Sequence, residues 1–264
     1  MFTIFTHHTE SIEKLAAKLS QREDVLALLI SGSIAHGFAK PSSDVDIMIV
    51  ISEEDYAQRL STGDIHYWEN ESTNYESGYV DGKYISYSFM EKVAEIGSEP
   101  ARFAFEGAII AFSRIEHLDE LIGRIVRYPV ERKQDNLTRF YGQLEAWRWY
   151  CSEAKKHENR YLLQHSVNQL VLFGGRMILA YNEVLYPYHK WFLKVLDRTP
   201  KKPEHFMGLI DRVLEDPSED HIEQFYQSVK QFTDWKIDDR SWPVRFMEDS
   251  ELNWLQGMTP VSDI

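Results

Sequence analysis

Cysteine is almost absent from this chain of 264 residues, since Cys151 is the only one. A lone thiol excludes an intramolecular disulfide and a zinc site built from several cysteines, and it suits a reducing compartment. We therefore expect Cys151 to be an inert residue packed inside the protein.

Long apolar segments, repeats and low-complexity tracts are missing as well. No run approaches the ~18 apolar residues of a membrane-spanning helix. Residues 1–13 lack the cationic and apolar pattern of a targeting segment. The sequence therefore predicts a cytoplasmic protein with no membrane partner. Hydrophobic residues make up 43% and charged residues 27%, the balance of a water-soluble globular protein.

Positive charge is scarce, with 29 Lys and Arg against 42 Asp and Glu and a net charge of −13. Such a surface repels phosphate polymers and slows their association. This argues against long DNA or RNA as the main substrate. An acidic surface would suit a cationic small molecule, although many ordinary cytosolic proteins are equally acidic.

The first fifty residues predict a helix and two buried strands. Apolar residues in 10–19 follow helical spacing, and the nearly unbroken apolar runs 25–30 and 46–51 are typical of buried strands. The intervening segment, 32–43, holds two glycines and a proline and predicts one helical turn followed by a loop.

Alternating aromatic and β-branched residues continue the sheet beyond a short helix after Ser52. Asp81-Gly82 separates residues 77–80 from residues 83–89, and this dipeptide predicts a two-residue β-hairpin turn. Residues 106–112 predict an edge strand. The N-terminal part is therefore mixed α/β.

Helical periodicity dominates the second half, in residues 118–126, 135–158 and 160–185. The pattern predicts two domains, a mixed α/β domain over residues 1–115 and a helical domain over residues 116–264. Gly174-Gly175 inside the third helix has no nucleotide fingerprint around it, so close helix packing is its expected purpose.

Two carboxylates open the second strand. Asp44 and Asp46 are two residues apart, so strand alternation points both to one side, within reach of one cation. Adjacent anions raise each other's pKa unless a cation neutralises them. Magnesium commonly uses one or two carboxylates plus substrate phosphates. For an isolated Asp-x-Asp the alternative is a turn cap at Asp44 and a solvated Asp46.

The segment before this pair favours the metal site. Ser31-Gly32-Ser33 ends the preceding strand, where a glycine lets a phosphate approach backbone N–H groups and a serine hydroxyl adds a donor. A helix beginning just after Ser33 would direct its positive end to the same phosphates.

Residues 28–50, LLISGSIAHGFAKPSSDVDIMIV, resemble the nucleotidyltransferase superfamily of DNA polymerase beta, in its aminoglycoside and lincosamide nucleotidyltransferase branch. The resemblance rests on Gly32-Ser33, ten intervening residues and Asp44-Val45-Asp46. It implies an α+β fold, with a nucleotidyltransferase-type mixed sheet flanked by helices and followed by an all-helical domain. In that branch the helical domain contributes acceptor contacts and closes over the nucleotide.

By this resemblance Gly32 and Ser33 would bind the outer phosphates of a nucleoside triphosphate, and Asp44 and Asp46 would be catalytic ligands of Mg²⁺. An acceptor hydroxyl would attack the α-phosphate of ATP, transferring AMP and releasing pyrophosphate. The partners would be the nucleotide and a small-molecule acceptor. The sequence leaves open the identity of the acceptor, the preferred nucleobase and the oligomeric state.

Superfamily members usually add a third carboxylate from a later strand. In the predicted strand 83–89 the corresponding position is Ser86, which is a poor magnesium ligand. Asp81 is the nearest acid but is better explained by turn chemistry. Glu71, Glu76 and Glu106 are further candidates, none of them supported by spacing.

Two residues of the helical half are candidate nucleotide contacts. Lys190 would pair with the triphosphate and Tyr188 would stack on the base or the acceptor, by a looser likeness to the helical part of small-molecule nucleotidyltransferases. The alternative is a solvated Lys190 and a Tyr188 that packs between helices.

The leading hypothesis is therefore a magnesium-dependent nucleotidyltransferase that acts on a small molecule. Ser86 leaves open a catalytically impaired protein of the same fold that binds nucleotide in a regulatory role. A further alternative is an antitoxin-like enzyme that adenylylates a protein side chain.

Overall fold

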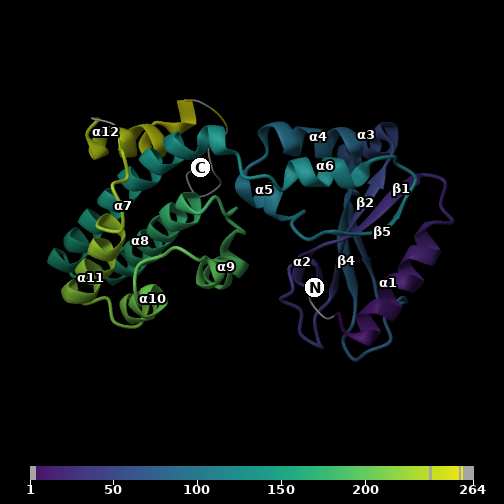
Figure 1. Ribbon diagram of the computed structural model, residues 1–264, viewed down its shortest axis with the longest axis horizontal. Coiled ribbons are helices and arrows are strands. Elements are labelled where there is room, and N and C mark those ends of the chain that lie inside the picture. The colour runs from purple at the N-terminus through teal and green to yellow at the C-terminus, as the bar shows by residue number, and fades with distance from the viewer. Residues whose placement is uncertain (1–3, 238–239, 256, 258–264) are drawn as a thin grey trace. The chain divides into compact units, whose positions relative to one another are not determined.

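The computed structural model describes residues 4–237, 240–255 and 257 (Figure 1). The chain divides into two compact units, Met1–Arg127 and Tyr128–Ile264, each with its own internal contacts. Within the described residues no helix is both long enough and apolar enough to cross a membrane.

A five-stranded mixed sheet forms the centre of the first unit, which confirms the predicted α+β class. The strand order is β3-β4-β2-β1-β5. β2 and β4 are parallel, whereas β1 pairs antiparallel with β2 and β5, and β3 pairs antiparallel with β4. The strands are β1 (Val25–Ile30), β2 (Val45–Ile51), β3 (His66–Glu69), β4 (Val80–Ser86) and β5 (Ile109–Ser113).

Helices pack on both faces of this sheet, and each face builds its own apolar core. α1 (Thr6–Leu19) contributes Leu15 and Leu19 to the core on one face. α4 (Tyr87–Ile96) and α6 (Leu118–Ile125) build the core on the other. The unit also contains α2 (Gly32–Ala35), α3 (Glu53–Thr62) and α5 (Glu99–Phe103).

The predicted hairpin turn at Asp81-Gly82 is wrong, because both residues lie inside β4. Asp81 pairs with Asp46 and Gly82 pairs with Ile47 in the parallel ladder between β4 and β2. A β-carbon on Gly82 would lie 2.4 Å from the carbonyl oxygen of Ile47. Gly82 therefore allows β2 and β4 to approach each other closely. Turn statistics do not distinguish a glycine with this role from a glycine in a turn.

Gly82→Ala is expected to destabilise the first unit by about 1 to 3 kcal/mol, the usual cost of overpacking. The added methyl group would collide with the backbone of Ile47, which cannot move without disturbing the ladder. Urea unfolding should measure the loss. Gly123→Ala in α6 is the matched control, since a β-carbon there meets nothing within 4 Å. Gly123→Ala should stabilise the first unit by about 0.5 kcal/mol, because alanine is the better helix former. Equal effects of Gly82→Ala and Gly123→Ala on stability would contradict this account.

The first unit ends at Arg127, after α6, whereas the periodicity predicts a boundary near residue 115. Leu118, Leu121 and Ile125 of α6 are buried in the core that also contains Met48 of β2 and Met90 of α4. Tertiary packing assigns this helix to the first unit, whereas its sequence periodicity matched the helices that follow.

Among the described residues of the second unit the regular structure is helical, as predicted. The long helices α7 (Lys133–Lys156) and α8 (Arg160–Tyr181) pack along one another, and α9, α10 and α11 pack on α8. The shorter elements include α9 (Phe192–Arg198), α10 (Phe206–Glu215), α11 (Glu219–Lys230), α12 (Trp242–Phe246) and the short helices η1 (Val130–Arg132) and η2 (His189–Trp191).

Two predictions about packing in this unit are confirmed. β-carbons on Gly174 and Gly175 would lie 2.8 Å from the ring of Phe225 and 2.3 Å from the ring of Phe192, so the glycine pair admits two aromatic side chains to the surface of α8. Cys151 is fully buried in α7, and burial raises the pKa of its thiol to about 12. A thiol with that pKa stays protonated and unreactive near neutral pH.

Candidate active site

Asp44 and Asp46 lie at the beginning of β2, on one side of the strand. Val45 between them is fully buried on the α1 face, while both aspartates are half-buried. Further along β2, Met48 lies on the aspartate face beneath α4 and α6. The carboxylates therefore project from the end of this face, beyond the core that the two helices cover.

The Gly32-Ser33 turn lies directly against Asp46. The backbone N–H of Ser33 donates to the Oδ2 of Asp46 at 3.4 Å, and the N–H of Ser31 donates to its carbonyl oxygen at 2.9 Å. Gly32 has a φ of +59°, and a β-carbon there would lie 1.8 Å from Oδ2 of Asp46. Only glycine fits between the turn and the carboxylate.

The hydroxyl of Ser33 is buried and has no hydrogen-bond partner among the described residues. Buried polar atoms normally have a partner, so an orphaned donor beside a carboxylate is suited to an oxygen of a bound ligand. The predicted helix begins at Gly32 and not after Ser33, and it makes a single turn.

A third carboxylate, Asp81 of β4, lies next to Asp46. The two residues are partners in the parallel ladder, where paired side chains point to the same face. Oδ1 of Asp81 is 2.6 Å from Nε2 of His66 on the neighbouring edge strand. The signal that could have revealed Asp81 is the apolar content of Val80, Tyr84 and Ile85 around it, which favours one continuous strand through the Asp-Gly dipeptide.

The position predicted for the third acid, Ser86, is wrong. Ser86 pairs with Ile51 at the far end of the ladder. Its buried hydroxyl accepts the N–H of Phe89 at 3.2 Å and thereby caps α4. The other candidates also lie elsewhere: Glu71 pairs with Lys18 of α1, Glu76 is exposed in the turn before β4, and Glu106 lies in the loop before β5.

Tyr79 and Lys83 also belong to this face and were missed from the sequence. Asp44 raises the pKa of the Tyr79 phenol, first through its charge and then through a side-chain hydrogen bond, and the charges of Asp81 and Asp46 add to the shift. The phenol is therefore close to all three carboxylates. Lys83 is two residues beyond Asp81, so it projects from the same face. Nearby protein atoms lower the pKa of Lys83 by desolvation.

The residues present fit a divalent cation shared with a phosphate ligand. Two half-buried carboxylates at the beginning of β2 and the orphaned hydroxyl of Ser33, in the turn that lies against Asp46, form a small set of oxygen donors. Magnesium completes such sets with substrate phosphates and water. Within the described residues no three His, Cys, Asp or Glu side chains are grouped closely enough to hold a metal ion by themselves.

Glu69 fastens the edge strand β3 to α1 behind the carboxylates. Its buried side chain accepts hydrogen bonds from Lys18 and Ser72. Burial by itself would raise the pKa of Glu69, but the hydrogen bonds from Lys18, Ser72 and Tyr67 hold the pKa below its usual 4.5.

Glu69→Gln is expected to lower the free energy of unfolding near neutral pH by about 1 kcal/mol, since the pair with Lys18 is partly exposed. The pKa of Glu69 is lower in the folded state. The stability that its charge provides is therefore present above the unfolded pKa and is lost as pH falls through the folded pKa. Urea unfolding should show the difference from wild type shrinking on acidification. A difference that grows would contradict this account.

The two residues predicted in the helical half, Tyr188 and Lys190, lie at the beginning of η2 in the second unit. Tyr188 is 60% exposed and adopts φ +66° and ψ 178°, a conformation otherwise almost confined to glycine. Nζ of Lys190 lies 5.1 Å from the ring centroid of Trp191, and Nζ of Lys194 lies over the same ring at 4.9 Å.

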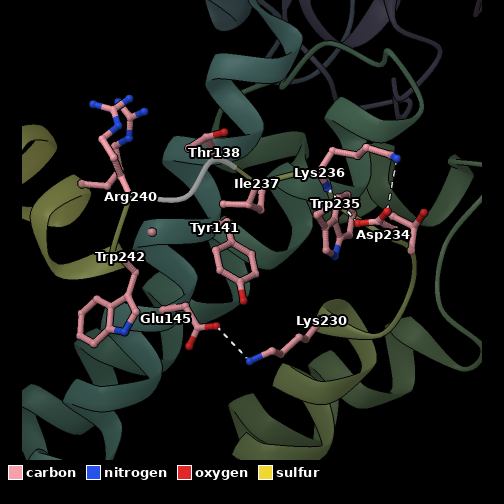
Figure 2. Close-up of a pocket in the computed structure, with 13 residues that line it drawn as sticks. Thr138, Tyr141, Glu145, Lys230, Asp234, Trp235, Lys236, Ile237, Arg240 and Trp242 are labelled. Carbon is pink, nitrogen blue, oxygen red and sulfur yellow. Dashed lines mark hydrogen bonds and ion pairs between the residues drawn. The ribbon is translucent and has the colours of Figure 1, made fainter.

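The second unit contains a cavity of about 610 Å³ beside α7 and α11, and Figure 2 shows its aromatic and charged walls. Glu145 accepts hydrogen bonds from the hydroxyl of Tyr226 at 2.7 Å and from Lys230 at 3.3 Å. Tyr188 and Lys190 do not line it. The lining residues include Tyr141, Glu145, Lys230, Asp234, Trp235, Lys236, Arg240 and Trp242.

A protein-family model agrees with this geometry. Residues 12–110 match the family model of the nucleotidyltransferase domain. A nucleotidyltransferase-like protein from Exiguobacterium sibiricum 255-15 is structurally similar with a TM-score of 0.48 and 9% identity, over 96% of this chain and 81% of that one. No curated protein matches the chain. The resemblance carried by the Gly-Ser and Asp-x-Asp motif is confirmed at the level of the superfamily, and residues 12–110 form a nucleotidyltransferase domain.

Proposed function

We propose that the protein transfers AMP from ATP to a hydroxyl group of a small molecule, with Mg²⁺ as cofactor. The domain itself supports nucleotidyl transfer in general. The observation that carries the proposal is the register of β2 and β4, which places Asp81 beside Asp46, next to the orphaned hydroxyl of Ser33. The hydrogen-bond donors for a phosphate and the three carboxylates therefore lie at the same end of the sheet.

Each residue has a role in this proposal. Ser33 and the backbone of Gly32 bind the outer phosphates, and Asp44 and Asp46 hold the magnesium ion. Bound there, Mg²⁺ would neutralise charge that develops on the phosphates during transfer. Lys83 adds a positive charge on the same face, and it forms no ion pair with another described residue.

In this proposal Asp81 orients the acceptor and takes its proton. The acceptor oxygen forms a bond to the α-phosphorus, the bond from that phosphorus to the bridging oxygen of pyrophosphate breaks, and the hydroxyl proton passes to Asp81. His66 hydrogen-bonds Oδ1 of Asp81 and thereby fixes the orientation of the carboxylate. A positioned carboxylate of this kind acts by orientation and by general base catalysis.

Tyr188 and Lys190 complete the proposal from the second unit, as contacts to the base and to the triphosphate. Their support is the exposure of both side chains and the strained backbone of Tyr188, since backbone strain of this kind concentrates at ligand-binding segments.

Radiolabelled ATP tests the proposal when it is incubated with the protein, magnesium and a panel of aminoglycoside and lincosamide acceptors. Release of pyrophosphate together with a labelled acceptor is expected, and Asp44→Ala should abolish both. Label on a protein in place of the small molecule would indicate a protein-adenylylating enzyme. Absence of product with every nucleotide, metal and acceptor, with Asp44→Ala equal to wild type in nucleotide binding, would refute the proposal.

The alternative of a catalytically impaired protein was motivated by Ser86. Asp81, and not Ser86, is the ladder partner of Asp46, and this register supports the active form over the impaired one.

A further inference from the structure

We propose that the exposed rings of Trp68 and Tyr79 form a platform that binds a ring of the acceptor, on the same face of the sheet as the carboxylates. This inference rests on the proposed function and adds to it the class of acceptor, a hydroxyl compound with a neutral or cationic ring.

Register places both aromatic residues beside the carboxylates. Trp68 of β3 is the ladder partner of Asp81, and Tyr79 precedes Asp81 by two residues, so both side chains project from the carboxylate face. Their ring centroids are 6.4 Å apart with an interplanar angle of 26°, which is a stacked arrangement. Trp68 is 56% exposed and Tyr79 is 37% exposed.

The order of strands separates the platform from the phosphate turn. Gly32 and Ser33 follow β1, Asp46 lies on β2, Asp81 lies on β4 and Trp68 lies on β3, which is also their order across the sheet. Phosphates bound at Ser33 would therefore lie on one side of the carboxylates, and the platform lies on the other. A hydroxyl that attacks from the platform side would meet the α-phosphate over Asp46 and Asp81.

Both rings are held in place by the protein itself. The residue after Trp68 is Glu69, whose buried carboxylate binds Lys18 of α1 and so fastens the edge strand. The carbonyl oxygen of Tyr79 accepts the N–H of Val45 at 3.0 Å, and its phenol interacts with Asp44. Little conformational entropy is therefore lost when a ligand ring stacks on them.

Charge determines which rings the platform accepts. The phenol of Tyr79 interacts with Asp44, and the charges of Asp81 and Asp46 also act on it, so a phosphate or carboxylate on the acceptor ring would be repelled at the platform. The faces of tryptophan and tyrosine rings attract cations and the apolar faces of neutral rings. The expected acceptor is therefore neutral or cationic, with its hydroxyl attached to the ring or close to it.

Binding measurements test the platform without any turnover. The probes are methyl glucosaminide as a cationic ring, glucose 6-phosphate as an anionic ring and ethanolamine as a cationic hydroxyl compound without a ring. Saturation-transfer NMR and calorimetric titration with magnesium present would compare wild type with Trp68→Ala, Trp68→Phe and Trp149→Ala. Trp149 of α7 is a matched control, because it is 47% exposed and lies in the other unit.

Trp68→Ala should raise the Kd of methyl glucosaminide about fivefold, as loss of one stacking surface does. Trp68→Phe should restore most of the affinity, and Trp149→Ala should leave it unchanged. Glucose 6-phosphate and ethanolamine should bind wild type more weakly than methyl glucosaminide.

Three results would overturn the platform. The first is no binding of methyl glucosaminide to wild type, and the second is equal affinity of wild type and Trp68→Ala for this sugar. The third is a loss of MgATP affinity in Trp68→Ala with the sugar unaffected, which would assign the rings to the nucleobase. Failure of the proposed function is a separate result, because it shows as absent pyrophosphate release while these affinities remain.

Discussion

Asp81→Asn is expected to lower the rate of AMP transfer by about a hundredfold to a thousandfold, the range for loss of one preorganised charged group at a reacting centre. The amide keeps the size of the side chain and can still bond His66, so the fold should survive. It cannot accept the proton of the attacking hydroxyl. The measurement is pyrophosphate release at saturating ATP, with unfolding curves as a check on stability.

Ser86→Ala and Glu76→Gln are the controls for this experiment, because the sequence offered both positions for the missing acid. Ser86→Ala removes the cap of α4 and should cost about 1 kcal/mol of stability with little change in rate. Glu76→Gln changes an exposed side chain and should change neither. If Ser86→Ala lowered the rate as much as Asp81→Asn, the assignment by strand register would be wrong.

The phosphate turn and the first two carboxylates could be predicted from the sequence because they are local. One strand, one turn and the next strand follow within about thirty residues, and every step between Val25 and Ile51 has its own signal in apolar runs, glycine and alternation. The structure places Gly32, Ser33 and Asp46 in contact through this single connected segment.

Asp81 could not be assigned in the same way, because its neighbours come from pairing between distant strands. Sequence patterns do not give the register of two strands separated by some thirty residues. The Asp-Gly dipeptide carried a strong local turn signal, and the close approach of β2 and β4 overrode it. Trp68, Tyr79 and Lys83 have no motif at all, since only the ladder places them beside the aspartates.

The helical half shows the same limit. Periodicity predicted α7 and α8 to within a few residues, and the glycine pair indicated close packing. The identity of the packing partners was not encoded locally. The sequence periodicity of α6 resembles that of α7 and α8, but its apolar residues fill the core on one face of the sheet in the first unit.

Gly32→Ala is expected to reduce AMP transfer by about a hundredfold, comparable with a misplacement of catalytic groups by an ångström. Its β-carbon would lie 1.8 Å from Oδ2 of Asp46, so either the carboxylate or the turn must move. The φ of +59° adds a backbone cost of about 1 to 2 kcal/mol for a residue with a β-carbon. Pyrophosphate release and MgATP titration would measure the loss.

Gly63→Ala separates the two contributions. Gly63 ends α3 with a φ of +76°, and a β-carbon there meets nothing within 4 Å. Both variants should lose a similar amount of stability from the backbone, whereas only Gly32→Ala should lose nucleotide affinity and rate. A Gly32→Ala protein that binds MgATP and turns over like wild type would show that the turn does not hold the phosphates. Equal losses of activity in both variants would attribute the effect to stability, and not to the contact between the turn and Asp46.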